Sequence, residues 1–335
     1  MRRVFLALSV FACLSCIEAQ NWQEVCRTAK AQPLVPVEPA GPLAASQLPD
    51  CDETALYYGL GANPDYAAAL QCGWYQRAHP RPQVGNMFYG PGVLTMLYAN
   101  GRGVPRDYTL AIRFACENPW AATAEFEARV GHLDRLRDTH SETATFDLCD
   151  DITSGLSGGA CTSVKTRTRD TARDARIADI VNGFSAAAKA AFPPLQKAEA
   201  AFEQARIEGE VDLSGTLRGA FQLEEEARLR DQFLINLERF GSGDIPAASA
   251  ADLATLDLQL NAVYRRLQNS PASQWQYGTV TPQGIRNTER KWLALADAWT
   301  AFSRTAWPRL SAARVRAQII RLRLHQLRSL DASRP

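Results

Sequence analysis

The spacing of apolar residues predicts helices through the second half of the chain. Apolar side chains recur every three or four positions over 217–240, over 249–267 and from 282 to about 302. A last helix is expected from about 312 to 330. No segment alternates apolar and polar residues as a half-buried strand would. The pattern predicts an all-α protein, with a short helical-repeat segment followed by an antiparallel helical bundle.

Cap and turn residues mark where several helices should begin and end. Residues 171–192 and 195–208 are rich in good helix formers, and Pro193-Pro194 is expected to break the helix between them. The turn that follows carries Asp212 and Ser214 as candidate caps.

Two further helix starts follow recognised capping patterns. Ser249 with Asp252 three residues later forms a capping-box pattern. Thr281 before Pro282 places a cap ahead of a proline at the first helical position. Both patterns predict a helix that begins at the next residue.

Residues 1–19 have the pattern of a secretory signal peptide. Arg2-Arg3 precedes an almost wholly apolar run to Ile17, and Ala19-Gln20 is the expected cleavage point. The run is shorter than the roughly 20 residues that span a bilayer. The alternative is lipidation at Cys13 or Cys16, whose surroundings loosely match a bacterial lipobox, and only then is membrane association expected.

Composition and charge narrow the class of protein. The chain has 335 residues, of which 46% are hydrophobic, with 37 basic and 36 acidic side chains. This content excludes a disordered protein, and the balance of charge gives no support for nucleic-acid binding. The segment 20–50 holds five prolines from residue 33 onward and is expected to be an extended arm.

The cysteines indicate an oxidising compartment. Removal of the signal peptide leaves six cysteines, at positions 26, 51, 72, 116, 149 and 161. An even number in an exported chain predicts disulfides, with fifteen possible pairings for six cysteines. We therefore expect a periplasmic or secreted protein of a Gram-negative type bacterium, bridged only in its first half.

Residues 51–130 contain an internal repeat. Five residues recur after a shift of 42 positions: Gly59, Gly61, Asp65, Tyr66 and Ala69 become Gly101, Gly103, Asp107, Tyr108 and Ala111. Paired glycines allow a tight turn between two helices, and the aspartate caps the second helix. The period predicts stacked helical pairs.

The second copy resembles a Sel-one-like repeat, which is a tetratricopeptide-like helical pair. The residues that carry the resemblance are Tyr98, Gly101, Gly103, Val104, Asp107, Ala111 and Phe114. Leu56 and Ala62 replace the tyrosine and valine in the first copy. Such repeats usually serve as binding or scaffold surfaces. We expect Cys51 to face Cys72 across the first pair, which leaves Cys26 with Cys116 by elimination.

Residues 146–162 contain two cysteines that are expected to enclose a Gly/Ser-rich loop. Cys149 and Cys161 are twelve positions apart, which predicts a local bridge worth about 3 kcal/mol in the chain-entropy model. Residues 155–159 match G-x-S-x-G formally, but a nucleophile elbow needs a strand before it and a histidine partner after it. No metal-ligand spacing and no phosphate-binding loop appears. We expect no catalytic residue, no cofactor and no metal, hence no enzyme.

Residues 249–302 resemble the N-terminal-type domain of LprI-like lysozyme inhibitors, a family of exported bacterial helical proteins. The pattern is carried by Asp257, Leu260, Asn261, Tyr264, Leu267, Ile285, Arg286, Glu289, Arg290, Trp292, Leu293, Asp297 and Ala298. The resemblance extends more weakly over residues 146–335. Thr300 stands where family members often carry a cysteine. The resemblance implies binding of a lysozyme-type hydrolase.

The motif residues themselves have two interpretations. Tyr264, Trp292 and the leucines of the pattern fit a helical core. The polar members Asp257, Asn261, Arg286, Arg290 and Asp297 are expected either to form a buried or half-buried polar network that fixes helix register or to form a ligand site.

Charge is unevenly distributed along the second half. No acidic residue lies between Ala298 and Leu330, where seven arginines occur. The stretch is expected to be a packed helix with a solvated basic face, or else a surface for anionic envelope components. The acidic run from Glu199 to Asp212 would favour approach of a basic lysozyme. Two functions follow: a non-catalytic envelope protein that binds another protein, with lysozyme inhibition implied by the resemblance, or a periplasmic scaffold whose repeats dock a partner.

Overall fold

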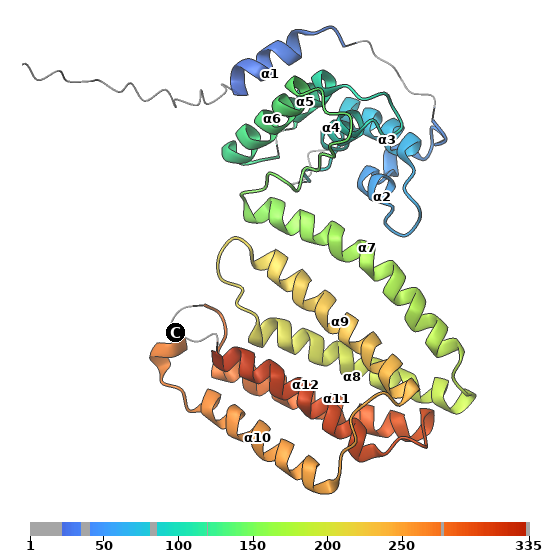
Figure 1. Cartoon of the computed structure of the whole chain (residues 1–335), viewed down its shortest axis with the longest axis vertical. Helices are drawn as coiled ribbons and strands as arrows, with labels where there is room; N and C mark the ends of the chain where they lie inside the picture. The colour runs from blue at the N-terminus through green and yellow to red at the C-terminus, as the bar shows by residue number, and fades with distance from the viewer. Residues whose placement is uncertain (1–21, 35–40, 81–85, 119, 276–277, 333–335) are drawn as a thin grey trace, which may run out of the picture. The chain divides into compact units, whose positions relative to one another are not determined.

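The computed structural model describes residues 22–34, 41–80, 86–118, 120–275 and 278–332. The expected signal peptide and the two candidate lipidation cysteines lie outside these residues. The described residues form twelve α-helices and two short 3-10 helices and contain no strand, which confirms the all-α prediction (Figure 1). Within the described residues, no helix is both long and apolar enough to cross a membrane.

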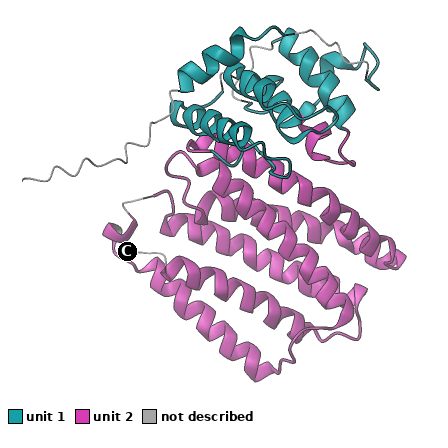
Figure 2. Ribbon diagram, turned by 45° about the horizontal axis from the view of Figure 1, so that its top comes forward, with its two compact units in different colours: residues 1–53, 66–151 teal, residues 54–65, 152–335 magenta. Residues whose placement is uncertain are grey.

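The chain divides into two compact units (Figure 2). Unit 1 comprises residues 1–53 and 66–151, and unit 2 comprises residues 54–65 and 152–335. The short helix α2 (Glu53–Tyr58) begins at one of the boundaries between them.

Unit 1 stacks its helices in sequence order. Helices α3 (Tyr66–Ala78), α4 (Pro91–Asn100), α5 (Tyr108–Glu117) and α6 (Thr123–Asp138) each pack on the next. Helix α4 has every residue but the last buried, as befits a helix at the centre of a stack. Helix α1 (Trp22–Ala31) lies within the expected arm 20–50 and packs on α5 and α6. The first part of that arm is therefore a helix and not extended chain. Cys26 and Ala29 are buried on the side of α1 that packs on the other helices.

The glycine pairs of the repeat adopt matching backbone conformations. Gly59 and Gly61 have φ of 72° and 89°, and Gly101 and Gly103 have φ of 63° and 71°. These left-handed values are unfavourable for residues with a Cβ atom, which explains the repeated glycines. Asp107 caps α5 by accepting a hydrogen bond from the backbone N–H of Leu110 at 2.9 Å, as predicted.

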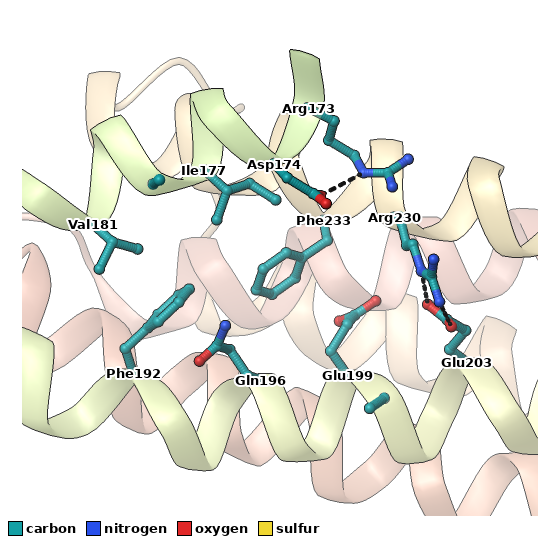
Figure 3. Close-up of a pocket in the computed structure, with 12 residues that line it drawn as sticks. Arg173, Asp174, Ile177, Val181, Phe192, Gln196, Glu199, Glu203, Arg230 and Phe233 are labelled. Atoms are coloured by element: carbon teal, nitrogen blue, oxygen red, sulfur yellow. Dashed lines mark hydrogen bonds and ion pairs between the residues drawn. The ribbon is translucent and has the colours of Figure 1, made fainter. Parts of the chain in front are cut away.

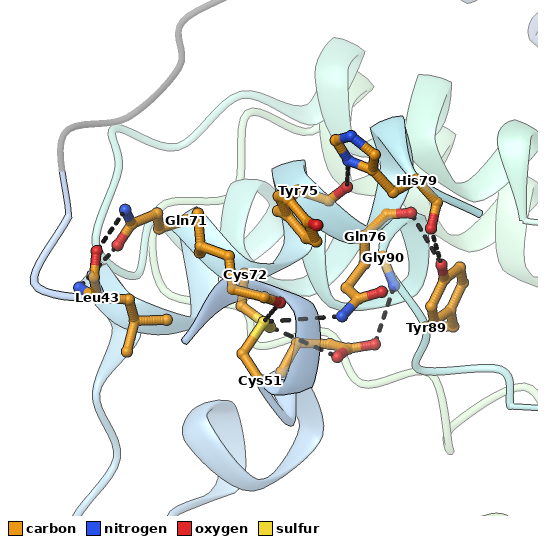
Figure 4. Close-up of a disulfide and its surroundings, with 11 residues drawn as sticks. Leu43, Cys51, Gln71, Cys72, Tyr75, Gln76, His79, Tyr89 and Gly90 are labelled. Carbon is orange, nitrogen blue, oxygen red and sulfur yellow. Dashed lines mark hydrogen bonds between the residues drawn. A yellow bond between two sulfur atoms is a disulfide. The ribbon is translucent and has the colours of Figure 1, made fainter. Parts of the chain in front are cut away.

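Disulfides fix the edges of unit 1. Cys26 pairs with Cys116, which ties α1 to α5, and Cys51 pairs with Cys72, which ties the segment after the 3-10 helix η1 (Leu48–Asp50) to α3 (Figure 4). Both bridges were predicted from the sequence. Cys149 and Cys161 are disulfide-bonded as well. Six disulfide-bonded cysteines in one chain are typical of a protein in an oxidising, extracellular or periplasmic environment.

A backbone clamp adds to the second bridge. The side-chain amide of Gln71 on α3 donates to the carbonyl of Leu43 at 3.0 Å and accepts from its N–H at 2.9 Å (Figure 4). This two-way pairing satisfies both backbone groups of a residue in an irregular segment. Residues 41–51 are thereby fixed to α3 at two places.

Unit 2 is a bundle of long helices. It comprises α7 (Gly155–Asn182), α8 (Ala186–Glu210), α9 (Arg218–Ser242), α10 (Ala250–Gln268), α11 (Pro282–Ala306) and α12 (Ala312–Ala332), with the 3-10 helix η2 (Ala272–Trp275) between α10 and α11. The closest pairs are α8 with α11, α7 with α9 and α10 with α12. One continuous core of aromatic and aliphatic residues runs through α8 to α12, with Trp299 wholly buried in it.

Caps set the helix starts of this unit. Ser249 and Asp252 form the predicted capping box at α10, and the Thr281 hydroxyl accepts from the N–H of Gly284 at α11, as predicted. The prediction for Asp212 was wrong: α9 starts without a side-chain cap, and Asp212 instead accepts from the N–H groups of Ser214 and Thr279.

Two predicted boundaries were wrong. Helix α8 continues through Pro193 and Pro194, and the break lies eight residues before Pro193, where Ser185 caps α8. Burial of Phe192 and Leu195 on either side of the prolines offsets the missing backbone hydrogen bonds. Likewise, the Gly/Ser-rich segment before Cys161 is the first turn of α7, because the Ser154 hydroxyl accepts from the N–H of Ser157.

A buried ion network joins four helices of unit 2. Arg323 on α12 donates to Glu210 on α8 and, at 2.9 Å, to Glu289 on α11. Arg206 on α8 also pairs with Glu210, and it reaches Glu225 on α9. The interpretation of the last helix as carrying a solvated basic face is therefore wrong at Arg323, whose side chain has no exposed surface.

Candidate functional site

A groove of about 520 Å³ opens between three helices of unit 2 (Figure 3). Its lining comes from α7, α8 and α9: Arg173, Asp174, Ile177, Ala178, Val181, Phe192, Gln196, Glu199, Ala200, Glu203, Arg230 and Phe233. Most of this surface is apolar, with a few polar groups at intervals, which is the usual make-up of a ligand-binding surface.

The packing of the helices leaves the groove open. Helices α7 and α8 are consecutive, but they are not among the closely packed pairs, whereas α7 packs on α9 and α8 on α11. The small side chains of Ala178 and Ala200 do not fill the space between α7 and α8. Phe192 and Phe233 lie with ring centroids 6.1 Å apart, and Phe233 also contacts the buried Trp299 at 5.3 Å. The aromatic part of the groove is thus supported by the core.

Two arginines at the groove are already paired with carboxylates. Arg230 donates two hydrogen bonds to Glu203, at 3.0 and 3.2 Å, and also pairs with Glu226. Arg173 donates to Asp170 at 2.6 Å and lies 3.6 Å from Asp174. These pairs hold both guanidinium groups in place.

Glu199 differs from the other acidic residues of the groove because no basic side chain pairs with it. Its carboxyl lies between the Phe233 ring and the Arg230–Glu203 pair (Figure 3). Burial, followed by repulsion from Glu203, raises the pKa of Glu199 to about 8. Glu199 as a whole is half-buried, and it lines the groove. A carboxyl with this pKa is mostly protonated, and hence uncharged, near neutral pH.

A small cavity of about 30 Å³ lies behind Glu199, on the core side. Its polar lining includes Gln232, Asn236, Gln326 and the indole of Trp299. The Trp299 N–H is near enough to lower the pKa of Glu199 slightly, yet its geometry does not make a hydrogen bond. The volume and the polar groups suit one or two waters. Glu199 therefore separates a polar internal cavity from the open groove.

The polar residues of the LprI-like pattern do not form a site. The side-chain amide of Asn261 donates to Asp257 one turn earlier, and Arg286 donates to Gln268 and Gln283. Asp297 pairs with Arg316. These five polar residues, Arg290 included, are all exposed, so the expected buried or half-buried network is absent among them. They alternate with the core positions of α10 and α11, which is how an amphipathic helix arranges its outer side.

The apolar members of the pattern lie largely where expected. Leu260, Leu267 and Trp292 are buried, and Tyr264 packs against the core while partly exposed. Leu293 is the exception, with 46% of its surface exposed. None of these residues lines the groove of unit 2.

In the sequence, Glu199 stands out only as the first residue of the acidic run from Glu199 to Asp212. That run is not a uniform surface, since Glu210 is wholly buried and Glu203 is paired with Arg230. A sharper signal was present in the spacing. One side of α8 carries residues at intervals of four, three and four: Phe192, Gln196, Glu199 and Glu203. The first of these is apolar and the next three are polar, which is unusual for a side of a helix that packs in a bundle.

Comparison with known proteins adds no relative. No protein-family model matches the chain, no curated protein matches it, and no solved structure matches it. Among the described residues, no group of three or more histidine, cysteine, aspartate or glutamate side chains is arranged to hold a metal ion. The groove of unit 2 combines accessible volume, aromatic surface and a carboxyl group that no described basic side chain pairs with.

Proposed function

We propose that this chain is an exported, non-catalytic protein that binds another protein through the groove of unit 2. The observation that carries the proposal is the groove itself, an open and largely apolar surface between α7, α8 and α9. Its two arginines, Arg173 and Arg230, are fixed by ion pairs with neighbouring carboxylates. Open apolar surfaces with polar rims commonly bind side chains or helices of partners. The disulfides of the chain fit a protein that works outside the cytoplasm.

A lysozyme-type hydrolase is the first partner to test. This choice rests on the LprI-like pattern over residues 249–302. The exposed polar residues of that pattern, on α10 and α11, offer a second surface, separate from the helices that line the groove. The acidic run now contributes less than expected to attraction of a basic lysozyme, because Glu210 is buried and Glu203 is paired.

The test is a titration of the mature chain against several lysozymes, with lysis of cell-wall suspensions as the readout. Slower lysis in proportion to added protein supports inhibition, and an Ala200→Trp variant, which fills the groove, is expected to weaken it. A matched variant outside the groove, Glu208→Gln, should inhibit as well as the original. Unchanged lysis at excess protein rules out lysozyme inhibition, and affinity capture from an envelope extract then seeks other partners.

A scaffold role for the repeat segment, residues 51–130, is the second candidate. The observation in its favour is the repeated pair of glycine turns, whose backbone angles match across the two copies of the repeat. Stacked helical pairs of this kind present continuous surfaces to peptides. If capture by the full chain survives Ala200→Trp in the groove, the binding surface lies elsewhere and the repeat segment becomes the leading candidate.

A further inference from the structure

The groove of unit 2 contains one acidic group that pairs with no basic side chain of the described residues. Arg230 is committed to Glu203 and Glu226, and Arg173 to Asp170, Asp174 and Asp231. On the core side, Arg323 is held by Glu210 and Glu289. Among the residues that the structure describes, Glu199 therefore faces the groove without a counter-ion.

The surroundings of Glu199 match the shape of a cation on an apolar stem. Phe192 and Phe233 line the groove beside it, and Ile177 and Val181 line it from α7 (Figure 3). Aromatic faces attract ammonium and guanidinium groups, and the aliphatic part of a lysine or arginine side chain packs well on such surfaces. Once Glu199 is ionised, an anionic ligand would be repelled by it, and a purely apolar ligand would leave the carboxylate unpaired.

We propose that the groove of unit 2 accepts a lysine or arginine side chain of the partner, whose charge pairs with Glu199 and whose stem lies on Phe192 and Phe233. This inference rests on the proposed function and specifies the group that is bound. It commits the partner to a basic residue flanked by apolar ones, presented on an exposed helix or loop.

Binding of a cation at this site is coupled to a proton. The carboxyl must ionise before it pairs with the incoming charge, so the affinity rises as pH increases toward the pKa of Glu199, about 8, and then levels off. The other charged groups at the groove are Arg173 and Asp174 on α7, Glu203 on α8 and Arg230 on α9, all held in the pairs described above. Glu199 is the member of this set with a strongly raised pKa.

The test uses hexylammonium as a probe that carries the proposed chemistry without a protein partner. The full chain is titrated with hexylammonium, with neutral hexanol and with anionic hexanoate, and the Trp299 indole N–H signal is followed by NMR. We expect hexylammonium to bind most tightly, with an affinity that increases by up to about 100-fold between about pH 6 and about pH 9, because the ionised fraction of a carboxyl with a pKa of about 8 rises by that factor. Equal binding of hexanol, or no dependence on pH, overturns the proposal.

Two variants on α8 localise the effect. Glu199→Gln is expected to weaken hexylammonium binding by about tenfold or more and to remove its pH dependence. Glu208→Gln changes an exposed carboxylate on the same helix, outside the groove, and should bind like the original. An equal loss in both variants means that general attraction, and not this site, drives binding. Circular dichroism confirms that each variant is folded.

The same variants separate this inference from the proposed function. If the protein inhibits a lysozyme or captures a partner equally well with Glu199→Gln, protein binding stands and the cation site is wrong. If hexylammonium binds through Glu199 but no protein partner is captured, the cation site stands and the proposed function is wrong. A peptide bearing one lysine between leucines, compared with its norleucine counterpart, distinguishes a side chain from a free amine as the occupant.

Discussion

Arg323 donates two hydrogen bonds to Glu210, at 2.6 and 2.8 Å, and neither side chain has exposed surface. The two residues are 113 positions apart, on α12 and α8, so the pair joins the last helix of the bundle to its second. Two parallel bonds between a guanidinium and a carboxylate fix both distance and orientation. The pair therefore sets the register of α12 against α8.

Removal of one partner from this pair should be strongly destabilising. Glu210→Ala leaves Arg323 buried with only Glu289 and is expected to lower the free energy of unfolding by about 3–5 kcal/mol. Glu208→Ala removes an exposed carboxylate from the same helix and should change it by less than about 0.5 kcal/mol. Urea unfolding followed by tryptophan fluorescence measures both. Similar values for the two variants would contradict the structural role of the pair.

The pKa of Glu199 predicts how stability depends on pH. Because the folded state holds the proton up to about pH 8 while the ordinary glutamate value is 4.5, the folded state binds more protons between these values and loses stability as pH rises through them. Glu199→Gln removes this loss. The variant should match the original protein below about pH 4.5 and become progressively more stable above it, by up to about 1.4 kcal/mol per pH unit. Unfolding curves of both proteins at a series of pH values test this prediction. A difference in the free energy of unfolding that does not change with pH would show that the pKa of Glu199 is not raised.

The two disulfides of unit 1 should contribute unequally. In the chain-entropy model, the Cys26–Cys116 bridge closes a loop of about 90 residues and stabilises by about 5 kcal/mol, and the Cys51–Cys72 bridge closes about 21 residues and stabilises by about 3 kcal/mol. Paired Cys→Ala variants test this ranking. The rate of amide hydrogen exchange in α3–α5 should increase in both variants, and it should increase more in the variant that lacks the Cys26–Cys116 bridge. The exchange rate in α8–α12 should stay unchanged in both. Equal effects on both sets of helices would show that the bridges do not act on unit 1 alone.

Two glycines provide a matched test of backbone strain in unit 1. Gly103 has a φ of 71°, and a Cβ atom there would lie 3.0 Å from the carbonyl oxygen of Tyr66, so Gly103→Ala should destabilise by about 1–3 kcal/mol. Gly131 lies inside α6, and a Cβ there would meet only the end of the Arg135 side chain, at 3.4 Å. Gly131→Ala should be neutral or stabilise by about 0.5–1 kcal/mol. Thermal unfolding compares them, and a destabilising Gly131→Ala would contradict this account.

Local patterns predicted most of the fold. The periodicity of α9 to α12 and the caps at Ser249 and Thr281 depend on residues within one or two turns, so they can be read directly from the sequence. The same holds for Asp107 and the glycine turns of the repeat. The break at Pro193-Pro194 was wrong because tertiary burial around the prolines outweighs their local effect.

The candidate site depends on contacts that no local pattern contains. The groove exists because α7 packs on α9 while α8 packs on α11, and that choice of neighbours involves the whole bundle. The burial of Arg323 likewise depends on a glutamate 113 residues away. A stripe of Phe, Gln and Glu on α8 was visible in the sequence, but the absence of a partner for Glu199 required the positions of the arginines on α7 and α9.

The order of the cysteines along the chain has a consequence for how the protein matures. A chain that emerges from its N-terminus presents Cys51 to Cys26 long before Cys116, the residue with which Cys26 is finally joined. The first pairing within reach is therefore not the native one. Correct maturation requires that Cys26 remain reduced until α5 has emerged, or that an early bond be exchanged by a thiol–disulfide isomerase. The yield of native protein should then depend on isomerase activity in the compartment as well as on an oxidant.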